Sequence, residues 1–212
     1  MIPRFDIDIS IDVDFSKVIQ PPWRMIREEN GLMANHDYVL LRGVTWKIFK
    51  EAFNLESKAL ELVDSKATTH GEFEKLADDL LFEDEWQGLE LPSFLDLGIA
   101  STVLSLYAFK CFPITSCRGH LKGHGGERHP LVAFFPQPDL APIIVGVAAG
   151  TGVGICNECV DEGWGLMVYG QSIIEMRSFA LGLQRAYPAT RRTKNAQRKS
   201  ERIKTKCQAK RS

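Results

Sequence analysis

The segment over residues 5–15 constrains the fold most, because its side chains alternate strictly between apolar and polar. A period of two matches the alternate facing of side chains in a β-strand, so the segment predicts a half-buried N-terminal strand. Its four aspartates would form a solvated face that discourages edge pairing, or would hold a divalent cation together with another acidic group. The alternating residues are Phe5, Ile7, Ile9, Ile11, Val13 and Phe15 against Asp6, Asp8, Ser10, Asp12 and Asp14.

The rest of the chain predicts an α+β fold, in which helices pack on a small mixed sheet that follows an N-terminal strand and helical region. We expect three parts: residues 1–90 with the strand and two helices, residues 93–188 as an α+β domain, and a basic tail over 191–212. The expected helices lie at residues 46–63, 71–82, 94–109, 140–149 and 173–187, and the expected core strands at 131–135, 153–156 and 165–169.

Charge is distributed unevenly along the chain. The formal net charge is −1, but residues 191–212 carry ten Lys and Arg against one Glu, which leaves 16 basic and 26 acidic side chains in the first 190 residues. A segment with so much charge cannot bury apolar surface, so we expect it to be disordered or a solvated helix. Such a tail either attracts polyanions such as nucleic acid or docks on the acidic body.

The chain carries no pattern that points to a membrane or to secretion. Its first residues lack the basic, apolar and small-residue regions of a signal peptide, and the longest apolar run, 94–111, is interrupted by polar residues. We therefore expect a cytoplasmic protein without a membrane span. In that reducing compartment, five cysteines favour free thiols or metal ligands over disulfides.

A glycine-rich segment from Cys111 to His129 concentrates the reactive residues of the chain. Two short pairs, Cys117-x2-His120 and Cys156-x2-Cys159, carry the thiolate and imidazole ligands that suit tetrahedral zinc. His129 or His124 would serve as a substitute or additional ligand. The alternative is that Cys156 and Cys159 are ordinary buried thiols.

Two other chemistries fit the same segment. Arg118, Lys122 and Arg128, with Gly119 and further glycines between them, predict phosphate binding by fixed cations and exposed N–H groups, unless the segment is a solvated turn. Cys117 is also a candidate catalytic nucleophile, with His120 as its base.

The residues ThrSerCysArgGlyHis at 115–120 resemble the Ser-Ser-Cys-Ser-Gly-Arg signature of the wybutosine-synthesising tRNA methyltransferase family. Ser116, Cys117 and Gly119 match, whereas Arg118 and His120 stand where that family has Ser and Arg. The resemblance spans residues 113–186 and implies tRNA binding and methyl transfer from S-adenosylmethionine. The pattern TSCxGH followed by HPLVxFF is also similar to that of uncharacterised bacterial proteins.

The sequence thus predicts a protein that acts on or binds nucleic acid or a nucleotide through a metal- or phosphate-binding site at residues 115–129. The alternative is a non-enzymatic interaction protein, such as an antitoxin- or defence-associated partner subunit, in which the cysteines and histidines are structural. The two hypotheses differ in whether the residue 115–129 segment or the charged surfaces carry the function.

Overall fold

The computed structural model describes residues 1–22, 41–80, 95–121, 128–160 and 163–187, without the side chains of 158–160, 163 and 164. A five-stranded mixed sheet forms its centre, in the order β1-β4-β5-β3-β2. All neighbouring strands are antiparallel except β1 and β4, which are parallel. The strands are β1 (Ile11–Asp12), β2 (Phe112–Arg118), β3 (Pro130–Phe135), β4 (Gly154–Val160) and β5 (Gly163–Tyr169).

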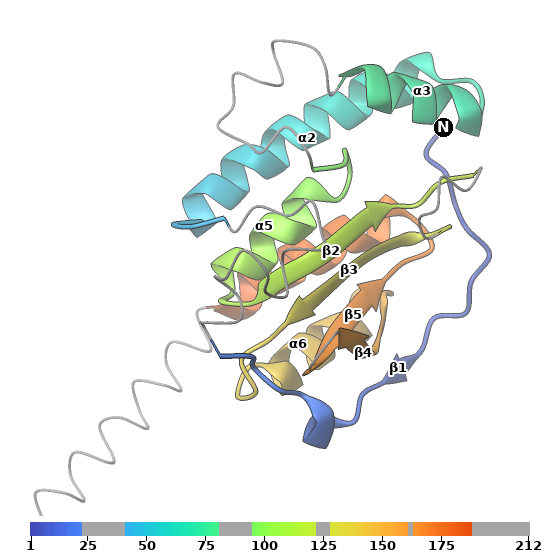
Figure 1. The fold of residues 1–212 in the computed structure, drawn as a ribbon. Coiled ribbons are helices and arrows are strands. Elements are labelled where there is room, and N and C mark those ends of the chain that lie inside the picture. The colour runs from blue at the N-terminus through green and yellow to red at the C-terminus, as the bar shows by residue number, and fades with distance from the viewer. Residues whose placement is uncertain (23–40, 81–94, 122–127, 161–162, 188–212) are drawn as a thin grey trace, which may run out of the picture.

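Helices pack on this sheet, which confirms the predicted α+β class (Figure 1). Helix α5 contacts β2 and β3, α2 lies on α5, and α6 contacts β4 and β1. The 3-10 turn η1 (Phe15–Lys17) follows β1. The helices are α2 (Trp46–Lys66), α3 (His70–Leu80), α5 (Ala100–Ala108), α6 (Ala141–Ala149) and a last helix over residues 173–187.

Most of the N-terminal segment is extended chain that does not pair as a β-strand. Only Ile11 and Asp12 pair with β4, so the predicted strand over 5–15 is much too long. The preceding residues are held by single hydrogen bonds instead, such as Phe5 N–H to the Gln171 carbonyl (2.7 Å) and the Gln171 side-chain amide to the Ile7 carbonyl (2.9 Å). The alternation therefore reflects a half-buried apolar side over residues 5–9 and at Val13, with the aspartates facing solvent and without a continuous ladder. Ile11 and Phe15 are themselves exposed.

Strand β2 replaces the first part of the segment that the sequence predicted as a loop. A register irregularity between Pro113 and Thr115 interrupts its pairing with β3. A bulge of this kind removes the period-two pattern by which a strand is recognised in sequence. Consequently the residues from Phe112 to Arg118 lie on a rigid edge strand of the sheet.

One hydrophobic core joins both predicted parts of the chain. Leu60 and Val63 of α2 lie in the same buried cluster as Val103 of α5 and Phe134 of β3. Helix α2 begins as predicted, since the Thr45 hydroxyl accepts a hydrogen bond from the Ile48 N–H at 3.3 Å. Within the described ranges, no helix combines the length and apolar character that crossing a membrane requires.

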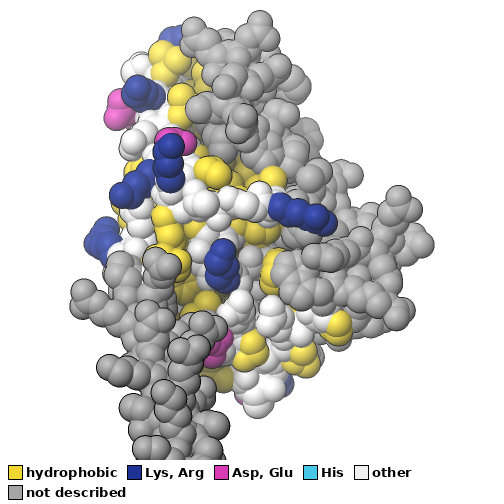
Figure 2. Space-filling model, turned by 90° about the vertical axis from the view of Figure 1, so that its left-hand side faces the viewer, with side chains coloured by type: hydrophobic (Ala, Val, Ile, Leu, Met, Phe, Trp, Pro, Cys, Tyr) yellow, Lys and Arg dark blue, Asp and Glu magenta, His cyan; other side chains and the backbone are white. Residues whose placement is uncertain are grey.

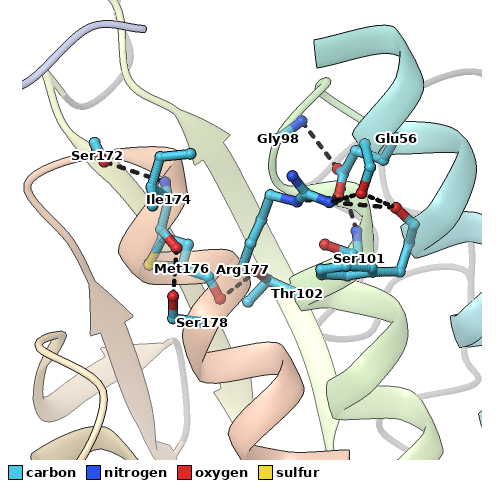
Figure 3. A network of polar contacts seen from close by, with 11 residues as sticks. Glu56, Gly98, Ser101, Thr102, Ser172, Ile174, Met176, Arg177 and Ser178 are labelled. Atoms are coloured by element: carbon cyan, nitrogen blue, oxygen red, sulfur yellow. Dashed lines mark hydrogen bonds and ion pairs between the residues drawn. The ribbon is translucent and has the colours of Figure 1, made fainter. Parts of the chain in front are cut away.

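The buried ion pair between Glu56 and Arg177 connects α2, the start of α5 and the last helix in this core (Figure 3). The Glu56 carboxylate, on α2, is fully buried and accepts hydrogen bonds from the N–H groups of Gly98 (2.9 Å) and Ser101 (3.4 Å) at the start of α5. Its other oxygen lies 3.2 Å from Nε of Arg177, on the last helix. Glu56 thus satisfies backbone N–H groups at the start of α5.

The pH dependence of stability tests this pair. Burial raises the pKa of Glu56 above 4.5, although Arg177 opposes the shift. An acid with a higher pKa when folded binds more protons in the folded protein, so its contribution to stability falls as pH rises from 4.5 toward the raised pKa. We expect wild-type protein to lose stability over this range relative to Glu56→Gln, which does not titrate. Urea unfolding of both proteins measures the difference, and a difference independent of pH would contradict the shift.

Candidate metal centre

Three side chains with metal-binding atoms converge at the end of β2. The ligand atoms of Asp96, Cys117 and His120 all lie within 4.8 Å of one another, and each residue is half-buried. Asp96 lies just before α5, Cys117 lies on β2, and His120 follows the end of that strand. This group could hold a metal ion.

Gly119 brings His120 back toward Cys117. Its φ of +83° is in the left-handed region, which residues with a Cβ rarely adopt. A Cβ at this position would lie 2.8 Å from the carbonyl carbon of His129, so the space is also closed to a side chain. The site therefore depends on glycine between its two sequence-adjacent ligands.

Replacing Gly119 with alanine should deform this turn. The left-handed conformation costs roughly 1–2 kcal/mol for a residue with a Cβ, and the clash with the His129 backbone adds to it. We expect lower stability and weaker metal binding, measured by urea unfolding and by zinc titration. Gly146→Ala is the matched control, because a Cβ there meets nothing within 4 Å and alanine favours helix α6. Equal effects of the two substitutions would contradict the role of Gly119.

Backbone N–H groups orient two of the three candidate ligands. The Gly119 N–H donates to the Cys117 sulfur at 3.3 Å, and the Arg118 N–H donates to Oδ2 of Asp96 at 3.1 Å. Such outer contacts fix the direction of the ligands.

Helix α3 holds the turn from its other side. The Leu121 N–H donates to the Glu74 carboxylate at 2.6 Å, and Nη2 of Arg118 forms an ion pair with Asp78, also at 2.6 Å. Glu74 and Asp78 are one helical turn apart, so they present both acceptors along one side of the helix. The turn that carries His120 is thus anchored to both the sheet and α3.

Three of the predicted phosphate-binding residues, Arg118, Gly119 and Arg128, lie among the described residues. The Arg118 side chain is 2% exposed and is paired with the more exposed Asp78, although its Nε and Nη1 have no hydrogen-bond partner among the described residues. Gly119 forms the turn at the metal centre, and Arg128 is exposed at the far end of the segment. Lys122 lies outside the described residues.

The second predicted cysteine pair does not reach this site. Cys156 and Cys159 lie on β4, and the strand order places β5 and β3 between β4 and β2. Three strand spacings amount to about 14 Å, far beyond a zinc–sulfur bond of roughly 2.3 Å. The strand order therefore does not support a four-ligand site with both pairs, and the described group of three contains Asp96 instead of a second cysteine.

One predicted histidine, His129, is not part of this group of three. The ring of His129 packs edge-on against Tyr169 of β5, with 5.7 Å between ring centroids. His124 lies outside the described residues. Asp96 was missed because it precedes Cys117 by a whole helix, but one signal existed: it is an acidic residue inside the apolar run over 94–111. A carboxylate in such a run requires a partner.

The fold and this cluster define an α+β protein with a candidate metal centre at the edge of a mixed sheet. Comparisons of the chain with protein-family models, with curated proteins and with solved structures gave no match. The resemblance to the wybutosine-synthesising methyltransferases stays a prediction from the residues at 115–120.

Proposed function

We propose that the protein binds one zinc ion through Asp96, Cys117 and His120. The observation that carries the proposal is the convergence of their carboxylate, thiolate and imidazole within 4.8 Å. A mixed oxygen, sulfur and nitrogen set suits zinc, which accepts all three at about 2.0–2.3 Å. Three protein ligands also leave a further coordination position.

Metal content tests this proposal directly. We expect elemental analysis of purified, zinc-reconstituted protein to find one zinc per chain, and to find none in Cys117→Ser or Asp96→Asn/His120→Ala. Cys156→Ser is the matched control, because Cys156 is also a half-buried cysteine on the sheet, but lies on β4. Absence of zinc from the wild type, or equal loss in Cys156→Ser, would refute the site.

The same three residues support a second function, in which Cys117 is a nucleophile. A thiol beside an imidazole and a carboxylate has the composition of a nucleophile with a base and an orienting group. The Gly119 N–H would stabilise the thiolate in this role as well. Iodoacetamide labelling of metal-free protein distinguishes the two functions. Fast, selective labelling of Cys117 in a protein that does not retain zinc would favour the nucleophile.

We further propose that binding to nucleic acid, if part of this function, is carried by the basic tail over residues 191–212. Its ten Lys and Arg against one Glu support this. On the face shown in Figure 2, the described Lys and Arg side chains are interspersed with hydrophobic and other side chains. A strong polyanion site needs several neighbouring cations, and the tail supplies them.

Fluorescence anisotropy with a labelled RNA tests the tail. We expect the full chain to bind with an affinity that falls steeply as salt increases, and a chain ending at residue 190 to lose this binding. Unchanged RNA binding without the tail would contradict the proposal. Loss of a co-purifying protein instead of RNA would favour the alternative function as an antitoxin- or defence-associated partner subunit.

A further inference from the structure

His129 lies next to the metal centre although its ring points elsewhere. Strand pairing sets Cys117 opposite Leu131 and Arg118 opposite Pro130. One residue beyond the paired residues, the segments that continue β2 and precede β3 are still in contact. A Cβ on Gly119 would lie 2.9 Å from Cα of His129. The backbone of His129 therefore contacts the turn between the two ligands Cys117 and His120.

The side chain of His129 belongs to the same face of the sheet as Cys117. Its ring packs on Tyr169, and Tyr169 of β5 pairs with Leu131 of β3, so the ring lies on the face of the sheet that carries Leu131. Leu131 is opposite Cys117, so His129 occupies the diagonal position. Diagonal neighbours in an antiparallel pair are about 7–8 Å apart. An imidazole can bridge that distance to a metal held by Cys117, because the metal–ligand bonds themselves add about 2.0–2.3 Å at each end.

The His129 ring could leave its present contact with Tyr169 without disturbing the position of Tyr169. The ring is half-buried and packs on Tyr169 with an interplanar angle of 68°. Tyr169 does not depend on this contact for its position, since its hydroxyl bonds to Ser10 Oγ at 3.0 Å and its ring covers Gly154. Rotation of His129 away from Tyr169 would therefore leave the surrounding sheet in place.

We propose that His129 completes the coordination of the metal, so that the loaded site is a closed tetrahedron of Asp96, Cys117, His120 and His129. This inference rests on the proposed zinc site and adds its fourth ligand. A closed set of four protein ligands is typical of structural zinc and leaves no position for a substrate. The metal would then join the lead-in to α5 with the ends of β2 and β3, and its role would be to fix this corner of the fold.

Cobalt(II) reports both ligand number and access. We expect cobalt-loaded wild-type protein to show a thiolate-to-cobalt band and intense tetrahedral visible bands, and to show no spectral change with azide. In His129→Ala, we expect the cobalt dissociation constant to rise at least about tenfold, the range that even outer contacts reach. Azide should then change the spectrum, because a position has opened. His129→Asn repeats the test in a polar variant, and circular dichroism checks that each variant is folded.

His70→Ala is the matched control, because His70 is a half-buried histidine at the start of α3. It should leave the cobalt spectrum and affinity unchanged. If azide alters the wild-type spectrum and His129→Ala binds cobalt as tightly as wild type, the fourth-ligand inference is overturned while the three-residue site stands. If wild-type protein gives no thiolate-to-cobalt band, the zinc site itself fails.

Discussion

Glu56→Ala lowers the free energy of unfolding by about 3–5 kcal/mol, which is the usual effect of removing one partner of a buried ion pair. Glu56 is fully buried, and the substitution leaves Arg177 without its carboxylate. The N–H groups of Gly98 and Ser101 also lose their acceptor. Each buried donor left without a partner costs about 1–3 kcal/mol by itself, so the expected loss draws on several independent terms.

Three further variants separate these terms in urea unfolding. Glu56→Gln keeps an oxygen for the N–H groups at the start of α5, so it should cost much less than alanine. Glu56→Leu/Arg177→Met removes both charges together and should be less destabilising than Glu56→Ala, because no buried charge is left unpaired. Glu61→Ala, an exposed glutamate on the same helix, should change stability by no more than about 0.5 kcal/mol. A similar loss for Glu61→Ala and Glu56→Ala would contradict the role of the pair.

The buried pair also shows which part of the fold was readable from the sequence. Apolar periodicity predicted α2 and the last helix, because both place one side on the core. The same periodicity gave no reason to bury Glu56, since a glutamate inside an amphipathic helix is usually exposed. Its burial follows from a partner far away in the sequence, Arg177, which only the tertiary fold brings near.

The sheet was predicted less well, for a related reason. Strand β3 is buried along its whole length, and the centre of β5 lies in the core. Both strands are therefore continuous apolar runs, which the sequence shows directly. By contrast, β2 carries Thr115, Ser116 and Arg118 and contains an irregularity, so no pattern marks it. Strand order is non-local as well, and no sequence pattern indicates that β5 and β3 lie between the strands that carry Cys117 and Cys156.

For the candidate site, the sequence predicted the ligands that are close in the chain. Cys117 and His120 are three residues apart, a chelating spacing that is visible without a structure. Asp96 joins them only because β2 is an edge strand whose Arg118 N–H donates a hydrogen bond to the Asp96 carboxylate just before α5. A ligand supplied across a helix–strand packing contact leaves little local pattern.

Zinc that binds at this site should stabilise the folded protein, and the gain in free energy of unfolding depends on the ratio of the free zinc concentration to the dissociation constant. A ligand that binds only the folded state at 100 times its dissociation constant adds about 2.7 kcal/mol to the free energy of unfolding. In a domain of this size that corresponds to a rise in Tm of roughly 5–10 °C. We expect metal-free wild-type protein to show this rise in a thermal melt when zinc is added, and to return to the lower Tm when a chelator removes the metal.

The cysteine variants make the thermal experiment specific. Cys117→Ser removes the thiolate that belongs to the group of three, so zinc should no longer raise its Tm. Cys156→Ser should keep the full rise, because Cys156 lies on β4 with two strands between it and the site. Cys111 offers no competing ligand, since it is 1% exposed and burial raises the pKa of its thiol far above the ordinary value. A zinc-dependent rise that survives Cys117→Ser would place the metal elsewhere in the chain, whereas a rise lost in Cys117→Ser alone ties the stabilisation to the corner where β2 meets α5.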